Sequence, residues 1–125
     1  MAEMWRFDRK LDFEKLNGLV PVVIQHADSG TVLMVGFMNE EAWQKTLGTG
    51  RVTLFRRTLG RVWVKGEDDG HYVEATEILV DCDDDTVIVK ARPTGNLCGH
   101  GYPGCFIQHA SPAGVTPPVT GAAHP

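Results

Sequence analysis

Aspartates dominate one short segment of the sequence, Val80–Thr86, in which Asp81, Asp83 and Asp85 occupy every second position. In an extended chain, side chains with this period point to one side, so the three carboxylates would converge. Converging carboxylates repel one another unless a cation lies between them, and oxygen-only ligands suit Mg²⁺ or Ca²⁺. The alternative is a solvated acidic turn between two strands, and the spacing alone does not separate the two interpretations.

Two of the three cysteines, Cys98 and Cys105, enclose a glycine-rich loop that also contains His100. With Cys82 they would give zinc three thiolate ligands and an open fourth position, which is the arrangement of a catalytic zinc site. The six residues between the loop cysteines do not match a zinc-ribbon spacing. The alternative is that the cysteines are buried packing residues. Their odd number argues against a disulfide framework.

A third group of residues combines cations with turns. Phe55–Thr58 contains Arg56 and Arg57, and Trp63–Gly70 contains Lys65. Clustered Arg and Lys side chains beside turns can hold phosphate oxygens. The alternative interpretation is a set of exposed charges on strands.

The elements that must position these residues are predicted to form an α+β domain, mainly antiparallel sheet with one or two short helices. Apolar and β-branched runs predict strands over residues 18–26, 31–37, 52–57, 61–65, 71–80 and 86–93. Asn39, followed by Glu40 and Glu41, predicts the start of a helix that ends near Gly48. Residues 1–15 are expected to form a short helix or an arm. Turns are expected at residues 28–30, 59–60, 67–70 and 83–85.

The length and charge of the chain bound its function. Its 125 residues suffice for one domain, which we expect over residues 1–110 and which would be a metal-binding domain if the metal-site interpretations above hold. The Pro-, Gly- and Ala-rich residues 111–125 predict a disordered tail. A net charge of −4 argues against nucleic-acid binding through bulk charge. No apolar run approaches the roughly 18 residues of a membrane span, and the charged N-terminus does not resemble a signal peptide, so we expect a cytoplasmic protein without membrane partners.

Separated motifs follow one another along the chain: Gly18–Pro21, Val32–Met34, Met38–Ala42, Thr46, Trp63-x-Lys65-Gly66, Asp81-Cys82-Asp83-x-Asp85, and Cys98 to Cys105-Phe106. In this order they resemble the phosphoribosyl-AMP cyclohydrolase family of histidine biosynthesis, which opens the adenine ring of phosphoribosyl-AMP. The resemblance covers residues 13–107, and it favours the metal-binding interpretation of both the cysteines and the aspartates.

The resemblance implies an intertwined, β-rich homodimer with active sites shared across the interface. It implies Zn²⁺ held by two cysteines of one subunit and one of the other, at the positions Cys98, Cys105 and Cys82. It implies Mg²⁺ at the positions Asp81, Asp83 and Asp85. The substrate-binding positions would be Arg56, Arg57, Thr58, Trp63, Lys65, Gly66, Asp68 and Asp69.

The reaction implied is attack of zinc-bound water on the adenine C6 atom, followed by cleavage of the N1–C6 bond. A zinc ion with three thiolates is a weaker Lewis acid than one with histidine ligands, so a nearby general base should assist. His100 is the candidate for this catalytic role. The family places histidine directly after the first loop cysteine, whereas here Gly99 intervenes, and an exposed loop histidine is the alternative interpretation.

Other departures from the family pattern lie at substrate positions. The family has Ser-Arg-Ser-Arg where this chain has Arg56-Arg57-Thr58-Leu59, and Thr-Ser-Gly where it has Asp68-Asp69-Gly70. Near the second loop cysteine, Gly104 replaces a serine. Carboxylates that replace hydroxyls would oppose a phosphate. From the resemblance, the chain is predicted to be a zinc-dependent hydrolase of a cyclic amidine. The departures leave two alternatives open: a specialised paralogue acting on a related purine-like nucleoside or nucleotide, and a non-enzymatic zinc-stabilised binding module.

Overall fold

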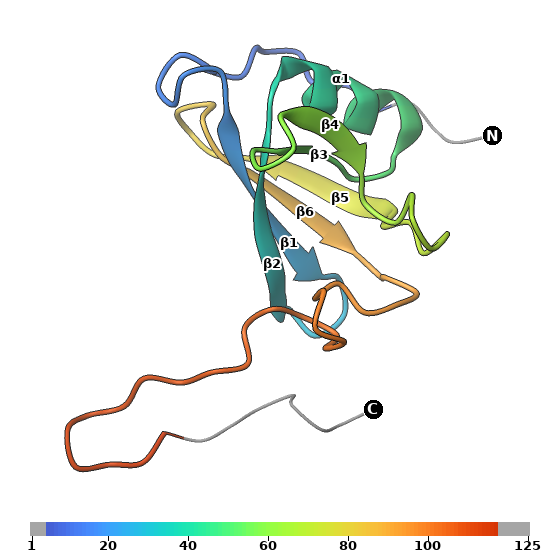
Figure 1. The fold of residues 1–125 in the computed structure, drawn as a ribbon. Coiled ribbons are helices and arrows are strands. Elements are labelled where there is room, and N and C mark those ends of the chain that lie inside the picture. The colour runs from blue at the N-terminus through green and yellow to red at the C-terminus, as the bar shows by residue number, and fades with distance from the viewer. Residues whose placement is uncertain (1–4, 118–125) are drawn as a thin grey trace.

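The structure, a computed structural model, describes residues 5–117, which contain six strands and one helix (Figure 1). In chain order these are β1 (Val20–His26), β2 (Val32–Met38), α1 (Glu40–Thr49), β3 (Thr53–Arg56), β4 (Arg61–Val64), β5 (Ala75–Val80) and β6 (Val87–Ala91). The predicted α+β class is confirmed. The described residues contain no helix with the length and apolar content that crossing a membrane requires.

Four strands form the main sheet, in the order β2-β1-β6-β5. Strand β1 pairs antiparallel with β2 and parallel with β6, and β5 pairs antiparallel with β6. Strands β3 and β4 form a separate antiparallel hairpin. Alternate residues of the two central strands are fully or almost fully buried, which is the period expected of a sheet with one face on the core: Val20, Val22, Ile24, Val87, Val89 and Ala91.

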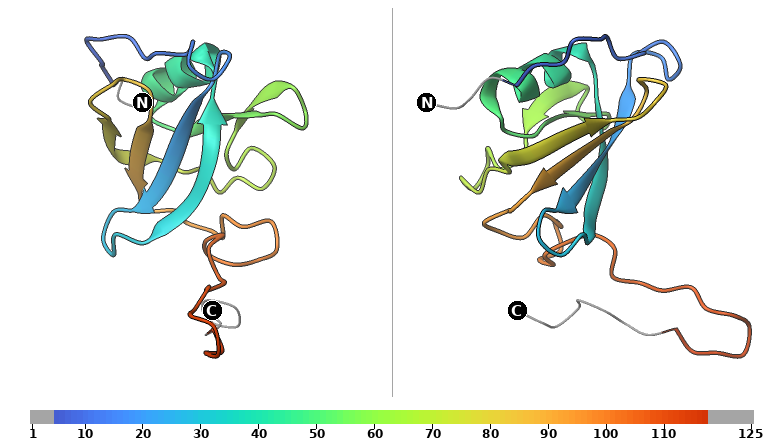
Figure 2. Two further views of the ribbon diagram at one scale, coloured as in Figure 1. Left: turned by 90° about the vertical axis from the view of Figure 1, so that its left-hand side faces the viewer. Right: turned by 180° about the vertical axis from the view of Figure 1, so that it is seen from behind.

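Helix α1 covers this core together with β3 (Figures 1 and 2). The predicted N-cap is confirmed, because the Asn39 side chain accepts a hydrogen bond from the Ala42 backbone N–H at 2.9 Å. The helix ends slightly later than expected, where Gly50 adopts the left-handed conformation. The buried Thr46 hydroxyl donates to the Ala42 carbonyl and accepts from the Thr53 N–H, which fixes the helix on β3.

Each expected strand differs from the structure by one or more residues at an end, and the start of β5 and the end of β6 are two of the larger differences. The strand predicted from residue 71 begins at Ala75, because the segment before it is held by other contacts: the Val52 N–H donates to the Val73 carbonyl at 2.8 Å. The strand predicted to end at residue 93 ends at Ala91. Residues 111–117 form no helix or strand, and the rest of the predicted tail, residues 118–125, lies outside the described residues. The division into a domain and a tail stays a prediction.

Residues 5–15 form an arm without helix in the described part of the chain. The arm begins against α1, where the Trp5 N–H donates to the Leu47 carbonyl and the Phe7 ring meets Trp43 edge-on at 5.8 Å. It ends beside the turn between β5 and β6, where the Asp12 N–H donates to the Asp84 carbonyl at 2.7 Å. The arm therefore connects the helix with the aspartate-rich turn (Figure 2).

Strand β6 separates the two segments that carry the candidate metal ligands. The aspartate-rich turn precedes β6, and the loop with Cys98 and Cys105 follows it. At about 3.3 Å per residue, the five residues of β6 place these segments at well-separated ends of the sheet (Figure 1).

Candidate functional site

A pocket of about 910 Å³ lies between β2, the β3–β4 hairpin and the loop after β6. Strand β2 supplies Met34, Gly36 and Phe37 to its wall, and the loop supplies Cys98 among others. Its lining includes every residue predicted to contact a substrate: Arg56, Arg57, Thr58, Trp63, Lys65, Gly66, Asp68 and Asp69. The fold thus brings two separate stretches of the sequence, residues 56–58 and residues 63–69, to one pocket.

Aromatic rings hold the cations of this pocket. The Arg56 guanidinium lies 4.8 Å from the centre of the Trp63 ring, and the Lys65 ammonium lies 4.9 Å from the same ring. The Arg57 guanidinium lies 4.3 Å from the centre of the Phe37 ring. Both arginines are exposed, so their N–H groups remain available to an anion while the rings restrict their motion.

The turn that carries Asp68 and Asp69 is tightly closed. Gly66 begins it with a positive φ of 98°, and a Cβ atom there would lie 2.3 Å from the His71 carbonyl oxygen, so no side chain fits. The Asp69 carboxylate accepts a hydrogen bond from the His71 N–H at 2.9 Å. One of the two carboxylates that replace family hydroxyls therefore stabilises the turn itself.

Lys65 joins the hairpin to the cysteine loop. Its ammonium donates to the Leu97 carbonyl oxygen at 2.9 Å, and Leu97 is buried. Burial lowers the pKa of Lys65, and the nearby Cys105, Asp69 and Cys98 side chains oppose that shift. Lys65 is half-buried. It lines the pocket and at the same time packs against the cysteine loop.

The two loop cysteines lie next to each other. Burial raises the pKa of the Cys105 thiol, and the neighbouring Cys98 thiol, within hydrogen-bonding reach, raises it further. The backbone holds the loop closed, because the Cys98 N–H donates to the Tyr102 carbonyl and the Cys105 N–H donates to the Leu33 carbonyl. At Gly104 a Cβ atom would lie only 3.1 Å from that Leu33 oxygen, which favours glycine where the family has serine.

His100 lies at the exposed tip of the same loop. Its neighbours Gly99 and Gly101 line the pocket, and its backbone N–H approaches the Cys98 sulfur at 3.4 Å. The imidazole is not part of the described pocket lining, so a role for it requires movement of the loop tip. The catalytic assignment of His100 stays a prediction.

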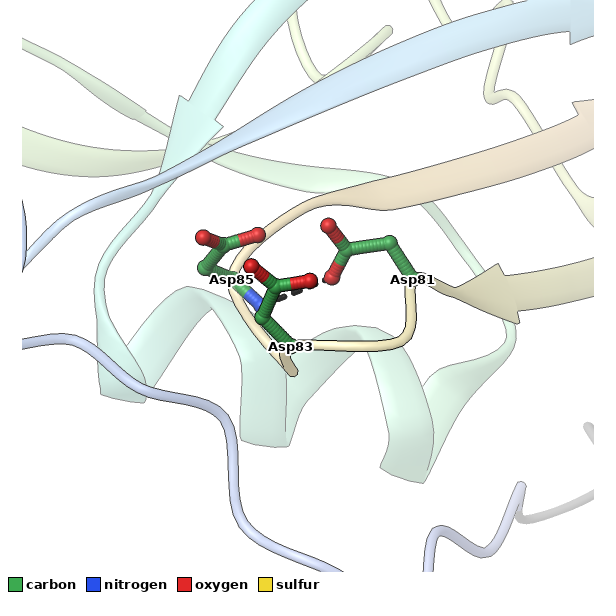
Figure 3. Close-up of side chains that lie close together, drawn as sticks. All are labelled: Asp81, Asp83 and Asp85. Atoms are coloured by element: carbon green, nitrogen blue, oxygen red, sulfur yellow. Dashed lines mark hydrogen bonds between the residues drawn. The ribbon is translucent and has the colours of Figure 1, made fainter.

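The carboxylates of Asp81, Asp83 and Asp85 converge, with ligand oxygens that all lie within 4.8 Å of one another (Figure 3). The geometry is not the strand alternation considered above, because residues 82–84 form a turn. The Asp81 carboxylate accepts hydrogen bonds from the backbone N–H groups of Asp85 and Thr86 at 2.9 and 3.2 Å, which shape this turn. Oxygen donors of this kind suit a hard cation such as Mg²⁺ or Ca²⁺.

Cys82 belongs to this acidic turn and not to the cysteine loop. Its exposed thiol lies 2.9 Å from an Asp83 carboxylate oxygen, and this contact raises the pKa of Cys82. Among the described residues, the aspartate trio is the one group of three such side chains close enough to share a metal ion. A single chain therefore does not bring Cys82 to the two loop thiols.

Several residues of the pocket were not predicted from the sequence. Phe37, Asn96 and His71 all line it. Met34 and Gly36 occupy alternate positions of β2, but Phe37 lines the pocket from the very next position, so the alternation of a strand alone does not identify all three. His71 has no local sequence signal, because its position depends on the closed turn after Gly66 and on the absence of a side chain at Gly95, where a Cβ atom would lie 2.1 Å from its Nδ1 atom.

Comparison with known proteins adds to this geometry. A sequence model of the family described as phosphoribosyl-AMP cyclohydrolase matches residues 34–107. The histidine biosynthesis bifunctional protein HisIE of Escherichia coli (strain K12) is 52% identical over 98 residues, which are 78% of this chain and 48% of that protein. The proteins of the same name from Salmonella typhimurium (strain LT2) and Bacteroides thetaiotaomicron are 50% and 48% identical, again over 78% of this chain and 48% of each relative. The chain spans about half the length of these curated relatives.

Proposed function

Because this chain belongs to the phosphoribosyl-AMP cyclohydrolase family, we propose that it hydrolyses phosphoribosyl-AMP, opening the adenine ring between N1 and C6 in histidine biosynthesis. The observation that carries the proposal is the pocket. It gathers all the substrate-binding positions implied by the family resemblance, and it borders the loop that contains two adjacent thiols. The three free cysteines fit the reducing cytoplasm, where we expect the protein to work.

The pocket suits a nucleotide that carries phosphate groups. Arg56 and Arg57 offer exposed guanidinium groups already positioned by Trp63 and Phe37. A guanidinium binds phosphate through paired, charge-assisted hydrogen bonds, and positioning it beforehand reduces the entropy lost on binding. We expect these two arginines to hold the phosphates and thereby to orient the adenine ring toward the cysteine loop.

The thiols fit a zinc site that two copies of the chain complete. Cys98 and Cys105 supply two neighbouring sulfur donors. The third cysteine, Cys82, lies near the opposite end of β6 in the same chain. A homodimer in which Cys82 comes from the second copy would supply the third donor. Zinc bound there would supply Lewis-acid activation of water. We expect His100 to accept the proton of the attacking water once the loop tip turns toward the pocket.

Exposed apolar side chains support the dimer. Val32 and Val35 on edge strand β2 are 41% and 47% exposed, and Phe106, directly after Cys105, is 62% exposed. An edge strand with apolar side chains and unpaired backbone groups is normally covered by another chain. Phe106 directly follows the loop, and Leu33, which lies between the two valines on β2, accepts a hydrogen bond from the Cys105 N–H. A second copy on this surface would therefore approach the two thiols.

The aspartate trio supports a Mg²⁺ site in the same assembly. It shares a turn with Cys82, so the copy that donates Cys82 to a zinc site would also bring its three carboxylates to that active site. There the carboxylates would bind a second metal ion near the substrate phosphates. Both metals and the arginines would then surround one bound nucleotide.

The direct test is hydrolysis of phosphoribosyl-AMP by the purified chain with zinc and magnesium, followed by ultraviolet absorbance. We expect turnover that a chelator abolishes and added zinc restores. Arg57→Ala should raise KM about 10- to 100-fold, because a charge-assisted hydrogen bond is worth roughly 1.5–3 kcal/mol. Arg61→Ala is the matched control. Arg61 lies opposite Arg56 in the strand register of the hairpin, but it is not part of the described pocket lining.

Absence of turnover in a folded, metal-loaded protein would reject this function. One observation favours a second candidate, a paralogue acting on a related purine-like compound with less phosphate, because Asp68 and Asp69 place carboxylates in the pocket. Ring opening of an adenine-type analogue that lacks a phosphate, without turnover of phosphoribosyl-AMP, would support that candidate.

A further inference from the structure

The Lys15 side chain lies against the aspartate-rich turn. The Lys15 ammonium lies 3.0 Å from an Asp85 carboxylate oxygen and 3.7 Å from one of Asp83. These are two of the three carboxylates whose oxygens converge in Figure 3. One positive charge therefore lies against the cluster that would hold a divalent cation.

Lys15 is held there by the arm on which it lies. The Asp12 N–H donates to the Asp84 carbonyl at 2.7 Å, and the Arg9 Nε–H lies 3.0 and 3.1 Å from the two Asp84 carboxylate oxygens. These contacts attach the arm to the turn independently of Lys15. The arm precedes residues 34–107, the part of the chain that the family model matches.

Space for an alternative position of Lys15 lies beside the turn. A small cavity of about 230 Å³ is lined by Asp12, Lys15, Leu16, Leu19, Pro21, Asp85 and Thr86. The Asp12 and Asp85 side chains both line this cavity together with Lys15. If the ammonium leaves Asp85, it can therefore move toward a second carboxylate.

We propose that Lys15 is an internal counter-ion of the aspartate trio, which a divalent cation displaces when it binds, so that Lys15 lowers the affinity of the site. The inference rests on the proposed function, in which these aspartates hold Mg²⁺. Mg²⁺ binds carboxylate oxygens at about 2.0–2.1 Å. An ammonium in contact with the same oxygens would then lie against a divalent charge and would be repelled.

The arrangement has a function in the metal-free protein. Three converging carboxylates destabilise the turn by repulsion, and Lys15 offsets part of that repulsion until the metal arrives. Because Lys15 is 47% exposed, its ion pairs contribute little to stability compared with their effect on a bound divalent ion. Its removal should therefore change metal binding more than folding.

The experiment is calorimetric titration of MgCl₂ into the purified wild-type chain and four variants. We expect Lys15→Met to bind Mg²⁺ about 3- to 10-fold more tightly, since one neighbouring positive charge is removed. Lys15→Arg keeps the charge and should bind as the wild type does. Lys10→Met is the matched control, because Lys10 lies on the same arm and forms no ion pair among the described residues. Asp81→Asn should weaken binding and so locates the ion.

A second measurement separates metal affinity from folding. Without Mg²⁺, Lys15→Met should melt at or slightly below the wild-type temperature, whereas saturating Mg²⁺ should raise its melting temperature more than that of the wild type. Equal or weaker Mg²⁺ affinity in Lys15→Met, with binding that still depends on Asp81, would overturn this inference and leave the magnesium site intact. Absence of Asp81-dependent binding in every variant would overturn the inference together with the magnesium site of the proposed function.

Discussion

The Lys65 ammonium donates a hydrogen bond to the Leu97 carbonyl oxygen, with 2.9 Å between the two atoms, and so joins the end of the β3–β4 hairpin to the residue before Cys98. The family resemblance implies a substrate contact for Lys65. The structure adds a second contact, because the same ammonium holds the loop that carries two thiols. The pocket and the cysteine loop are therefore joined through one side chain.

Lys65→Met should destabilise the protein by about 1–2 kcal/mol, because the carbonyl of the buried Leu97 loses its partner. It should also lower zinc affinity, since the loop is no longer held. Urea unfolding and competition with a zinc chelator measure the two effects. Lys45→Met, which removes an exposed helix ion pair with Glu41, is the control. Unchanged stability and zinc affinity would show that the hydrogen bond does not position the loop.

Mixing two inactive cysteine variants tests the shared zinc site. Cys82→Ser and Cys98→Ser should each lose zinc as pure proteins, because a thiolate is removed. After unfolding and refolding together, half of the dimers are mixed and each contains one intact site, so about one quarter of the wild-type zinc should return. Metal analysis of the refolded protein measures this. A Cys98→Ser and Cys105→Ser mixture is the control, and it should recover none. Equal zinc content in both mixtures would refute a site shared in this way.

The Asp68–Asp69 turn gives a prediction about the substrate. Asp68→Thr with Asp69→Ser should tighten binding of a phosphate-bearing substrate by roughly one to three orders of magnitude, because a like-charge contact near 4 Å costs on the order of 1–4 kcal/mol. Serine keeps an oxygen that can accept the His71 N–H hydrogen bond of Asp69. KM for phosphoribosyl-AMP is the measurement. If wild-type activity is full and the double variant does not improve it, the altered-substrate candidate is excluded.

The ion pair between Asp28 and Arg92 predicts a pH effect on stability. Arg92 hydrogen bonds lower the pKa of Asp28 in the folded protein. A carboxylate with a lowered folded pKa contributes stability above its unfolded pKa and loses it as the pH falls through the folded pKa. Asp28→Asn should therefore melt below the wild type at neutral pH, and the difference should vanish in acid. A difference that persists at low pH would show another cause.

Local sequence patterns predict much of this fold. The β-branched runs around Val22 and Val89 indicate central strands, and Asn39 with the two glutamates after it indicates the start of the helix. These predictions succeed because each depends on neighbouring residues. The parallel pairing of β1 with β6 joins residues more than sixty positions apart, and no local pattern specifies it.

The candidate site divides in the same way. Residue types and family resemblance identify the residues around Arg57 and Lys65, which the structure brings to one pocket. The position of Lys15 against Asp85 depends on how the arm lies over the turn, and short-range sequence patterns do not contain that information. The distance between Cys82 and the loop thiols likewise follows only from the length and direction of β6.

The placement of candidate ligands at both ends of β6 has a genetic consequence. If two copies complete the site and the proposed function in histidine biosynthesis holds, an allele altered at Cys82 and an allele altered at Cys98 would complement each other in one cell. Either allele by itself would then fail to support growth in medium that lacks histidine. Two alleles altered at the same end of the strand would not complement each other. Complementing pairs would then always combine one alteration before β6 with one alteration after it.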